Sequence, residues 1–513
     1  MKKSKLPEIK NKGNAILYAC LFAGVVLRFL MLGSHPLTAQ ETSAAAFSAG
    51  ANPLELLINN LANNNEAPLY YLLTYIWTFI FGFNEVSIRL LPAILGVISI
   101  FIVHRLTRSF YSEKVSVIAA SLFAISPFQI YFSQHSGPFT LQLITMLLMA
   151  YYFMLSVKYN SFVMGPFMFW AIAALYCGHL SLVLLLILNV ILFIRYKEEI
   201  RINLWIRAQI FIFIAWLPLV TYFIKMNTLI APQAFDKVLM APLLSLKNLL
   251  FGFTLEVNFW TIAVTAAASL FLIIGVITCR TVKEKRMTDI MSLIFFLTIG
   301  FAWISAMANR LAYSDSNFLL AGTMLIILVS IGLSHLSREG MILFTLVTAV
   351  FFSVSIVNYF NKNLWKAPDY KALYLEVVNE FKEGDIIIHS SAASYAPFEF
   401  YNKLEYKRNF PNRLIGVVPE YKGNMSVRES WRKIKKFLFE KAGMDIHAGH
   451  DKNLMTEAEA KTILKPGLRV WHVTETPMTG NEIKTAHVFL AKNQEAGKKI
   501  SVKGAQVTLS GWK

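Results

Sequence analysis

The chain contains little charge and little cysteine. Only 16% of its 513 residues are charged, whereas 56% are hydrophobic and the mean hydropathy is +0.50. A soluble chain of this length rarely shows that balance. The three cysteines, Cys20, Cys177 and Cys279, lie far apart in apolar segments, which excludes a disulfide framework and a thiolate metal site. Repeated apolar runs long enough to cross a hydrocarbon core predict a polytopic α-helical membrane protein.

The formal net charge of +18 does not indicate nucleic-acid binding, because much of the basic character falls in short loops between apolar segments. That pattern follows the positive-inside rule. Five lysines precede Gly13 and place the N-terminus in the cytoplasm. The apolar segment that follows is too long for a signal-peptide core and has no clear cleavage site, so it predicts a retained first helix.

Basic residues are absent from one long stretch. No Lys or Arg lies between Leu30 and Ile88, and the charged side chains of that stretch are Glu41, Glu55, Glu66 and Glu85. We expect 34–84 to form the first external loop. A polar loop with only carboxylates beside a bilayer is either a solvated face or an active site, and we favour the active site.

The segment 68–83 is aromatic and short for a span, so we interpret it as a juxtamembrane helix in the interface. If it crossed the membrane, the next helix would place Arg105, Arg108 and Lys114 outside, against the positive-inside rule. About eleven spans result, with an external C-terminus. Their approximate ranges are 14–33, 86–107, 115–132, 139–157, 162–177, 180–194, 208–224, 259–279, 290–308, 318–335 and 341–360.

A change in composition near 361 divides the chain into a transmembrane domain, 1–360, and an external soluble domain, 361–513. In the second part a helix, a Gly384–Asp385 turn and a buried strand follow one another. Further strand candidates, bounded by turn residues, are RVWHVTET, TAHVFLA and KISVKGAQVTLSGW. We therefore expect an α/β domain.

A set of short motifs spans 66–154. Its members are Glu66, Pro68, Phe81, Gly82, Ser87, Arg89, Leu90, Pro92, Ser126, Pro127, Tyr131, Ser133 and Gln134. With Gly178 and His179, they make the chain resemble the GT-C membrane glycosyltransferases. The resemblance is strongest to the bacterial relatives of protein O-mannosyltransferases and of lipid A aminoarabinose transferases. It implies a GT-C-like fold with the C-terminal domain in the periplasm and the helices in the bacterial inner membrane.

The same resemblance implies a polyprenyl-phosphate-linked sugar as donor and a hydroxyl of a glycan, lipid or protein as acceptor. A carboxylate of the first external loop would act as general base, with inversion at the anomeric carbon. Such a base typically contributes ~10²–10⁴-fold to the rate. The phosphate that leaves with its lipid needs fixed positive charge or hydrogen-bond donors. No cofactor is firmly implied, although a divalent cation is possible. The resemblance also allows for a protein partner, such as an enzyme of an envelope-polysaccharide system.

The resemblance gives each candidate residue a role. Glu41 and Glu66 are the candidate bases. The candidate substrate-binding residues are Arg28, Gln40, Tyr70, Arg89, Gln134, His135 and His179.

Each candidate also has a purely structural interpretation. Glu41 could be an N-terminal helix charge, and Glu66 the solvated end of a loop. Arg89 could pair with Glu85. An Arg within a membrane helix is costly unless paired, so Arg28 could pair with one of the loop glutamates. The two histidines could be plain interfacial residues.

For two further groups of polar residues, a structural role is a better explanation than a functional one. Arg310, Tyr313 and Asp315 are expected in a solvated loop. The DIHAGHD sequence, 445–451, could hold a metal but is more simply a polar loop.

The chain departs from the family pattern at five positions. Gln40 stands where the first carboxylate is usual, and Ala67 replaces a Lys. His135 occupies a position that is usually acidic, and Gly137 and Asn317 occupy positions that usually hold Arg. These changes sustain an alternative, a non-catalytic protein of the same fold that binds lipid-linked glycan or a partner enzyme. A lipid or glycan transporter is a further alternative, opposed by the scarcity of ionisable residues in mid-membrane.

Overall fold

A computed structural model describes most of the chain and divides it into two compact units. The helical unit comprises Met1–Ser34, Asn60–Phe81 and Val86–Trp365, and the sheet unit comprises His35–Asn59, Gly82–Glu85 and Lys366–Lys513. The described residues are 9–49, 52–59, 67–161, 163–219, 235–277, 281–308, 313–361, 368–389, 392–408, 410–415, 454–455, 464, 467–475, 498–502 and 505–511.

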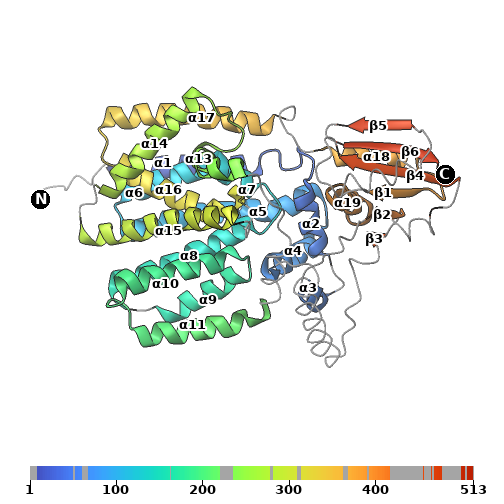
Figure 1. Ribbon diagram of the computed structural model, residues 1–513. Helices are drawn as coiled ribbons and strands as arrows, with labels where there is room; N and C mark the ends of the chain where they lie inside the picture. Colours follow the sequence, from blue (N-terminus) through green and yellow to red (C-terminus); the bar gives the residue numbers. More distant parts are fainter. Residues whose placement is uncertain are drawn as a thin grey trace, which may run out of the picture. The chain divides into compact units, whose positions relative to one another are not determined.

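The helical unit is built from long and shorter apolar helices (Figure 1). In chain order they are α1 (Ile9–Phe29), α4 (Pro68–Phe81), α5 (Glu85–Phe110), α6 (Glu113–Ile125), α7 (Pro127–Ser133), α8 (Phe139–Tyr159), α9 (Met164–Leu175), α10 (Leu180–Ile191), α11 (Ile202–Trp216), α13 (Phe235–Phe251), α14 (Phe259–Ile277), α15 (Val282–Met307), α16 (Leu319–Leu333) and α17 (Arg338–Phe360). A π-helical turn, Leu192–Tyr196, extends α10, and short 3₁₀ turns, Leu217–Leu219 and Asp315–Phe318, flank α11 and α16.

The described residues contain seven helices long and apolar enough to span a membrane, or eight if one bent pair counts as a span. The chain is thus a multi-pass membrane protein, although the predicted number of eleven spans is not confirmed. Among the predicted spans outside this count, 162–177 and 180–194 correspond to two shorter apolar helices, Met164–Leu175 and Leu180–Tyr196, and 115–132 corresponds to the bent pair.

The span predicted over 115–132 is broken. α6 ends at Ile125, α7 begins at Pro127, and the two helices meet at a bend of 58°. Proline lacks an N–H and disfavours helical geometry in the residue before it. Ser126 is accordingly extended, and its side chain accepts a hydrogen bond from the Gln129 N–H at the start of α7.

Helix α16 lies at the core of the helical unit, since 89% of its apolar window is buried. Its closest neighbour is α14, and glycines permit the approach. A Cβ on Gly332 would collide with the carbonyl oxygen of Phe271, and one on Gly275 with that of Leu328. Small residues let membrane helices pack backbone to backbone in this way.

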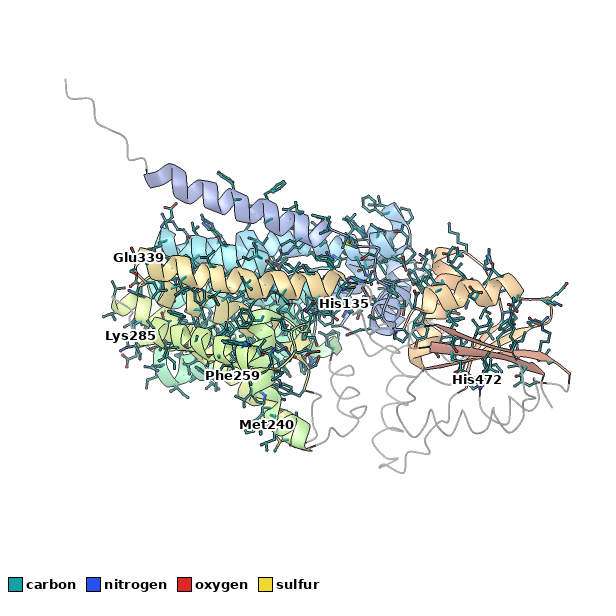
Figure 2. All side chains as sticks on the ribbon, turned by 90° about the horizontal axis from the view of Figure 1, so that it is seen from above. His135, Met240, Phe259, Lys285, Glu339 and His472 are labelled. Carbon is teal, nitrogen blue, oxygen red and sulfur yellow. The ribbon has the colours of Figure 1, made fainter. Side chains whose placement is uncertain are left out.

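Figure 2 shows Lys285, in the first turn of α15, and Glu339, in the first turn of α17, at one end of the helical unit, and His135 toward the other end. The predicted parity of the helices places turn 133–138 on the face opposite the basic loops. The orientation in the membrane stays a prediction.

The sheet unit contains a six-stranded sheet of order β3-β2-β1-β4-β6-β5. Its strands are β1 (Ile386–His389), β2 (Asn412–Ile415), β3 (Leu454–Met455), β4 (Arg469–Glu475), β5 (Lys498–Val502) and β6 (Ala505–Gly511). The first four are parallel neighbours, and β6 pairs antiparallel with β4 and β5. Helices α18 (Tyr370–Glu380) and α19 (Ala392–Glu399) complete an α/β unit as predicted. The predicted strand TAHVFLA lies outside the described residues.

Part of the segment predicted as the first external loop belongs to the sheet unit. The prediction assigned all of 34–84 to the transmembrane domain, whereas His35–Asn59 and Gly82–Glu85 group with the C-terminal residues. Helices α2 (Ala39–Phe47) and α3 (Pro53–Asn59) lie in this segment. α2 packs against α19, and the small side chains of Ala44 and Ala45 are buried.

Candidate functional site

In the helical unit, the candidate residues gather where several helix ends meet. Tyr70, fully buried in the first turn of α4, accepts a hydrogen bond from the Gly137 N–H over 3.0 Å. Its hydroxyl also lies 3.5 Å from Ser136 Oγ. The neighbouring Leu69 N–H donates to the carbonyl of Tyr176 over 2.9 Å. These bonds fix the start of α4 on the α7–α8 and α9–α10 turns.

Arg28 is fully buried near the end of α1 and donates to protein oxygens. Its acceptors are the carbonyls of Ala124 (2.7 Å), Gly24 (3.1 Å) and Phe123 (3.4 Å) and Ser133 Oγ (3.2 Å). Two of these carbonyls end α6, where a cation is favourable. Among the described residues Arg28 has no carboxylate partner, so pairing with Glu41 is not observed. Its role in substrate binding stays a prediction.

Gln134 is a cap for α1. Its Nε2 donates to the carbonyls of Leu27 and Leu30, each over 2.9 Å, and of Arg28 over 3.3 Å. These groups otherwise lack partners at a helix C-terminus. The side-chain N–H groups of Gln134, a predicted substrate-binding residue, therefore bind backbone carbonyls.

Two histidines border the same region. His135 is 7% exposed and stacks on Tyr131 with ring centroids 5.9 Å apart. His179 begins α10, and burial lowers the pKa of its imidazole to about 4. A lowered pKa favours the neutral imidazole, which can offer a hydrogen bond to a phosphate.

Arg89 is 3% exposed in the first turns of α5 and donates to the Leu32 carbonyl over 2.9 Å. The carboxylate of Glu85 pairs with Lys371 over 2.9 Å within the sheet unit. The two suggested roles of Arg89, phosphate binding and pairing with Glu85, stay predictions.

Glu41, in the sheet unit, is fully buried in the first turn of α2. Its Oε2 accepts from the Thr38 N–H (2.9 Å) and from Thr38 Oγ1 (3.2 Å), and its own N–H donates to Thr38 Oγ1 (3.3 Å). This reciprocal pair is a capping box. Gln40 beside it is exposed. The helix-terminal interpretation of Glu41 is thus realised, while its catalytic role stays a prediction. Glu66 lies outside the described residues.

A second polar network in the sheet unit, partly buried, joins distant segments. Tyr401 donates to Glu85 Oε1 over 2.8 Å, and Lys371 Nζ bridges Glu85 Oε2 (2.9 Å) and Glu405 Oε1 (3.3 Å). Burial and the charge of Glu85 raise the pKa of Tyr401. Burial would lower the pKa of Lys371, but the hydrogen bond and charge of Glu85 and the charge of Glu405 outweigh it and raise that pKa.

Sequence reasoning missed a polar cluster in the helical unit. Asp315 accepts from Ser245 and, over 2.6 Å, from Asn248 Nδ2. The expectation of a solvated loop is therefore wrong for Asp315. Lys247, 7% exposed, donates to the carbonyls of Gly252 (3.2 Å) and Leu255 (2.9 Å). The sequence feature that could have indicated this cluster is Lys247, a single lysine in the otherwise mostly apolar segment 238–251. Burial raises the pKa of nearby Tyr313 to about 12.

No group of three His, Cys, Asp or Glu side chains suited to a metal ion occurs within the described part of the chain. The DIHAGHD sequence and Arg310 lie outside it. A divalent cation stays a prediction.

Part of the chain matches a known protein family. The family model described as dolichyl-phosphate-mannose-protein mannosyltransferase matches residues 65–222. No curated protein sequence matches the chain.

Among solved structures, ArnT from Cupriavidus metallidurans bound to undecaprenyl phosphate is 11% identical with a TM-score of 0.62, covering 96% of this chain and 97% of that one. Its apo form gives a TM-score of 0.61 at 11% identity, with 97% and 98% covered. The archaeal oligosaccharyltransferase AglB from Archaeoglobus fulgidus, in complex with an inhibitory peptide and a dolichol-phosphate, is 12% identical with a TM-score of 0.51, over 98% of this chain and 74% of that one. The chain shares the overall fold of these solved structures, the GT-C fold.

Proposed function

We propose that the chain is a membrane glycosyltransferase that moves a sugar from a polyprenyl-phosphate donor to a hydroxyl of a glycan, lipid or protein. Transfer occurs outside the cytoplasmic membrane of a bacterium, with the N-terminus in the cytoplasm and the sheet unit external. The likeness to ArnT bound to undecaprenyl phosphate and to AglB with a dolichol-phosphate supports this class of donor.

The observation that carries the proposal is the placement of Glu41. It is a fully buried carboxylate in the first loop, and Thr38 fixes its orientation. An alcohol is a weak nucleophile, and a positioned carboxylate that accepts its proton contributes ~10²–10⁴-fold. The acceptor oxygen bonds to the anomeric carbon from the side opposite the phosphate, the carbon–oxygen bond to the phosphate breaks, and the proton passes to the carboxylate. Inversion follows. Glu66 is the second candidate for the base.

The other candidates fall into two groups, those proposed to bind substrate and those whose N–H groups bind other parts of the protein. Arg89 supplies positive charge for the phosphate, and Tyr70, His135 and His179 supply hydrogen bonds. Gln40 contacts the acceptor from its exposed position beside Glu41. Arg28 and Gln134 act mainly as supports, because their N–H groups are directed at backbone carbonyls and at Ser133.

A second candidate function is a non-catalytic protein that binds lipid-linked glycan. Two observations favour it. The residue where the family's first carboxylate is usual, Gln40, is neutral. One oxygen of Glu41 is occupied by the capping box.

The test compares purified full-length protein with its Glu41→Gln and Glu66→Gln variants against a panel of polyprenyl-phosphate sugars. Glutamine also serves at the third position of a capping box, so Glu41→Gln removes the base and keeps the helix cap. We expect a ~10²–10⁴-fold loss of turnover in one variant with unchanged thermal stability. Glu55→Gln, in the same loop, is the matched control and keeps activity.

The outcomes separate the alternatives. Donor binding without consumption by the wild type supports the non-catalytic function. Substrate-dependent flux in proteoliposomes without a new glycoside supports a transporter. Turnover that survives both substitutions shows that the base lies elsewhere.

A further inference from the structure

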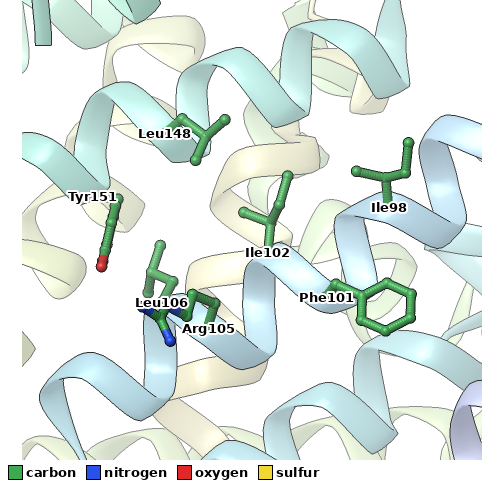
Figure 3. A pocket seen from close by; sticks show the side chains of 7 residues that line it. All are labelled: Ile98, Phe101, Ile102, Arg105, Leu106, Leu148 and Tyr151. Atoms are coloured by element: carbon green, nitrogen blue, oxygen red, sulfur yellow. The ribbon is translucent and has the colours of Figure 1, made fainter. Parts of the chain in front are cut away.

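A narrow apolar groove runs between α5 and α8 (Figure 3). α5 lines it with Ile98, Phe101, Ile102 and Arg105, whose spacing places them on one face of the helix. Leu148 and Tyr151 of α8 form the facing wall, and the cavity volume is about 240 Å³. In Figure 3, Arg105 and Tyr151 gather toward one end of the groove, away from Ile98 and Phe101.

The groove opens on the surface of a membrane span. Phe101 is 55% exposed and Ile98 is 42% exposed, on a helix whose length and composition suit a membrane crossing. Apolar side chains exposed at that depth face hydrocarbon. The natural occupant of such a groove is a lipid chain. The volume lies below the ~300–1,000 Å³ of sites that enclose a drug-sized molecule, so the groove suits a single chain.

Arg105 marks the polar end of the groove. α5 extends over 26 residues, or ~39 Å at 1.5 Å per residue, and Arg105 lies five positions before its end. It therefore reaches the headgroup level of the membrane face opposite the first loop.

The cations around Arg105 are engaged, whereas its own side chain is not. Arg108 pairs with Glu113 over 3.1 Å. Lys158 Nζ donates to the Ser109 carbonyl over 2.5 Å and lies 5.5 Å from the centre of the Phe110 ring. Within the described residues the Arg105 guanidinium makes no ion pair or hydrogen bond.

We propose that this groove binds one chain of an anionic phospholipid, with the lipid phosphate on Arg105. The planar guanidinium matches phosphate oxygens in a two-pronged geometry. The apolar wall below it covers the first part of the acyl chain. The lipid thereby fills the groove between α5 and α8 on the side remote from the candidate site. The site is independent of the proposed function.

The test is native mass spectrometry of the full-length protein in detergent micelles with added phosphatidylglycerol or phosphatidylcholine. We expect the wild type to retain one phosphatidylglycerol in preference to phosphatidylcholine, and Arg105→Gln to weaken that retention ~tenfold, the ratio that one lost charge-assisted contact produces. Arg108→Gln is the matched control and retains the lipid.

A second variant tests the apolar wall. Ile98→Trp fills the groove from its exposed rim, keeps Arg105 and is expected to lose the lipid. If Arg105→Gln does not purify, Arg105→Lys keeps the charge without the fork and is expected to bind with intermediate strength. Equal weakening by Arg105→Gln and Arg108→Gln, no preference for phosphatidylglycerol, or undiminished retention by Ile98→Trp overturns the proposal.

Discussion

The hydroxyl of Tyr401 donates a 2.8 Å hydrogen bond to Oε1 of Glu85, a residue 316 positions earlier in the chain. Glu85 begins α5, so the residue that opens a membrane span has its side chain buried in the sheet unit. Lys371 pairs with the other oxygen of Glu85 and with Glu405. A few charged side chains thus hold segments 82–85 and 366–405 together.

Lys371→Met is expected to destabilise the sheet unit. It leaves Glu85 and Glu405 facing each other without the cation between them, and removing one partner of a buried pair costs ~3–5 kcal/mol. Because the Lys371 side chain is 31% exposed, solvent reduces this to ~1–3 kcal/mol. Thermal unfolding of the purified protein checks it.

Lys403→Met is the control for that substitution. Lys403 pairs with Glu399 one helical turn away, and its side chain is 45% exposed. Such pairs contribute ~0.3–0.5 kcal/mol. Equal losses in the two variants would show that the network contributes no more than a surface pair.

Glu405→Gln is expected to stabilise the protein at neutral pH. Burial and the charge of Glu85 raise the pKa of Glu405 despite Lys371, and its Oε2 is buried without a partner among the described residues. A raised pKa means that the stability associated with Glu405 is complete below its unfolded pKa and is lost as pH rises through the folded value. Glutamine mimics the protonated form at every pH.

The melting temperature of Glu405→Gln should therefore exceed that of the wild type at pH 7 to 8, and the difference should vanish in acid below the unfolded pKa of Glu405. Glu399→Gln, on the neighbouring helical turn, should give no gain. A lower melting temperature for Glu405→Gln at neutral pH would mean that attraction to Lys371 outweighs the cost of the buried charge.

Local pattern predicted the helices well and their partners poorly. Hydropathy and loop charge gave α5 as 86–107, against Glu85–Phe110 in the structure. The break before Pro127 was missed because both halves are apolar and their summed length suits one span. Strands β2 and β3 are too short to show a period.

The candidate site shows the same limit. The sequence identified Arg28 as a buried cation that needs partners, but those partners are backbone carbonyls 95 and 96 positions away. Every residue has a backbone carbonyl, so the sequence does not show which carbonyls accept these hydrogen bonds. The Tyr401–Glu85 bond was equally invisible, since neither residue lies in a motif that refers to the other.

Gln134→Glu is expected to be more harmful than Gln134→Ala. The amide donates to three carbonyls at the end of α1, and a carboxylate of the same shape places negative charge against the negative end of a helix dipole. Alanine only removes the donor, at ~1–3 kcal/mol for unsatisfied buried acceptors. Thermal unfolding in micelles should rank wild type above Gln134→Ala and that variant above Gln134→Glu. The reverse order of the two variants would contradict the cap.

Gly275→Ala is expected to weaken the packing of α14 on α16. The added methyl group would meet the Leu328 carbonyl oxygen and lie 3.0 Å from the Gly332 nitrogen. These are backbone atoms that cannot rotate aside, so the helices must separate, at ~1–3 kcal/mol for an overpacked core. Gly300→Ala on α15 is the matched control, because a Cβ there meets nothing within 4 Å. Alanine favours the helix by ~0.5–1 kcal/mol over glycine, so Gly300→Ala should raise the melting temperature while Gly275→Ala lowers it. Shifts of the same sign in both variants would mean that backbone entropy, and not the contact between α14 and α16, governs these positions.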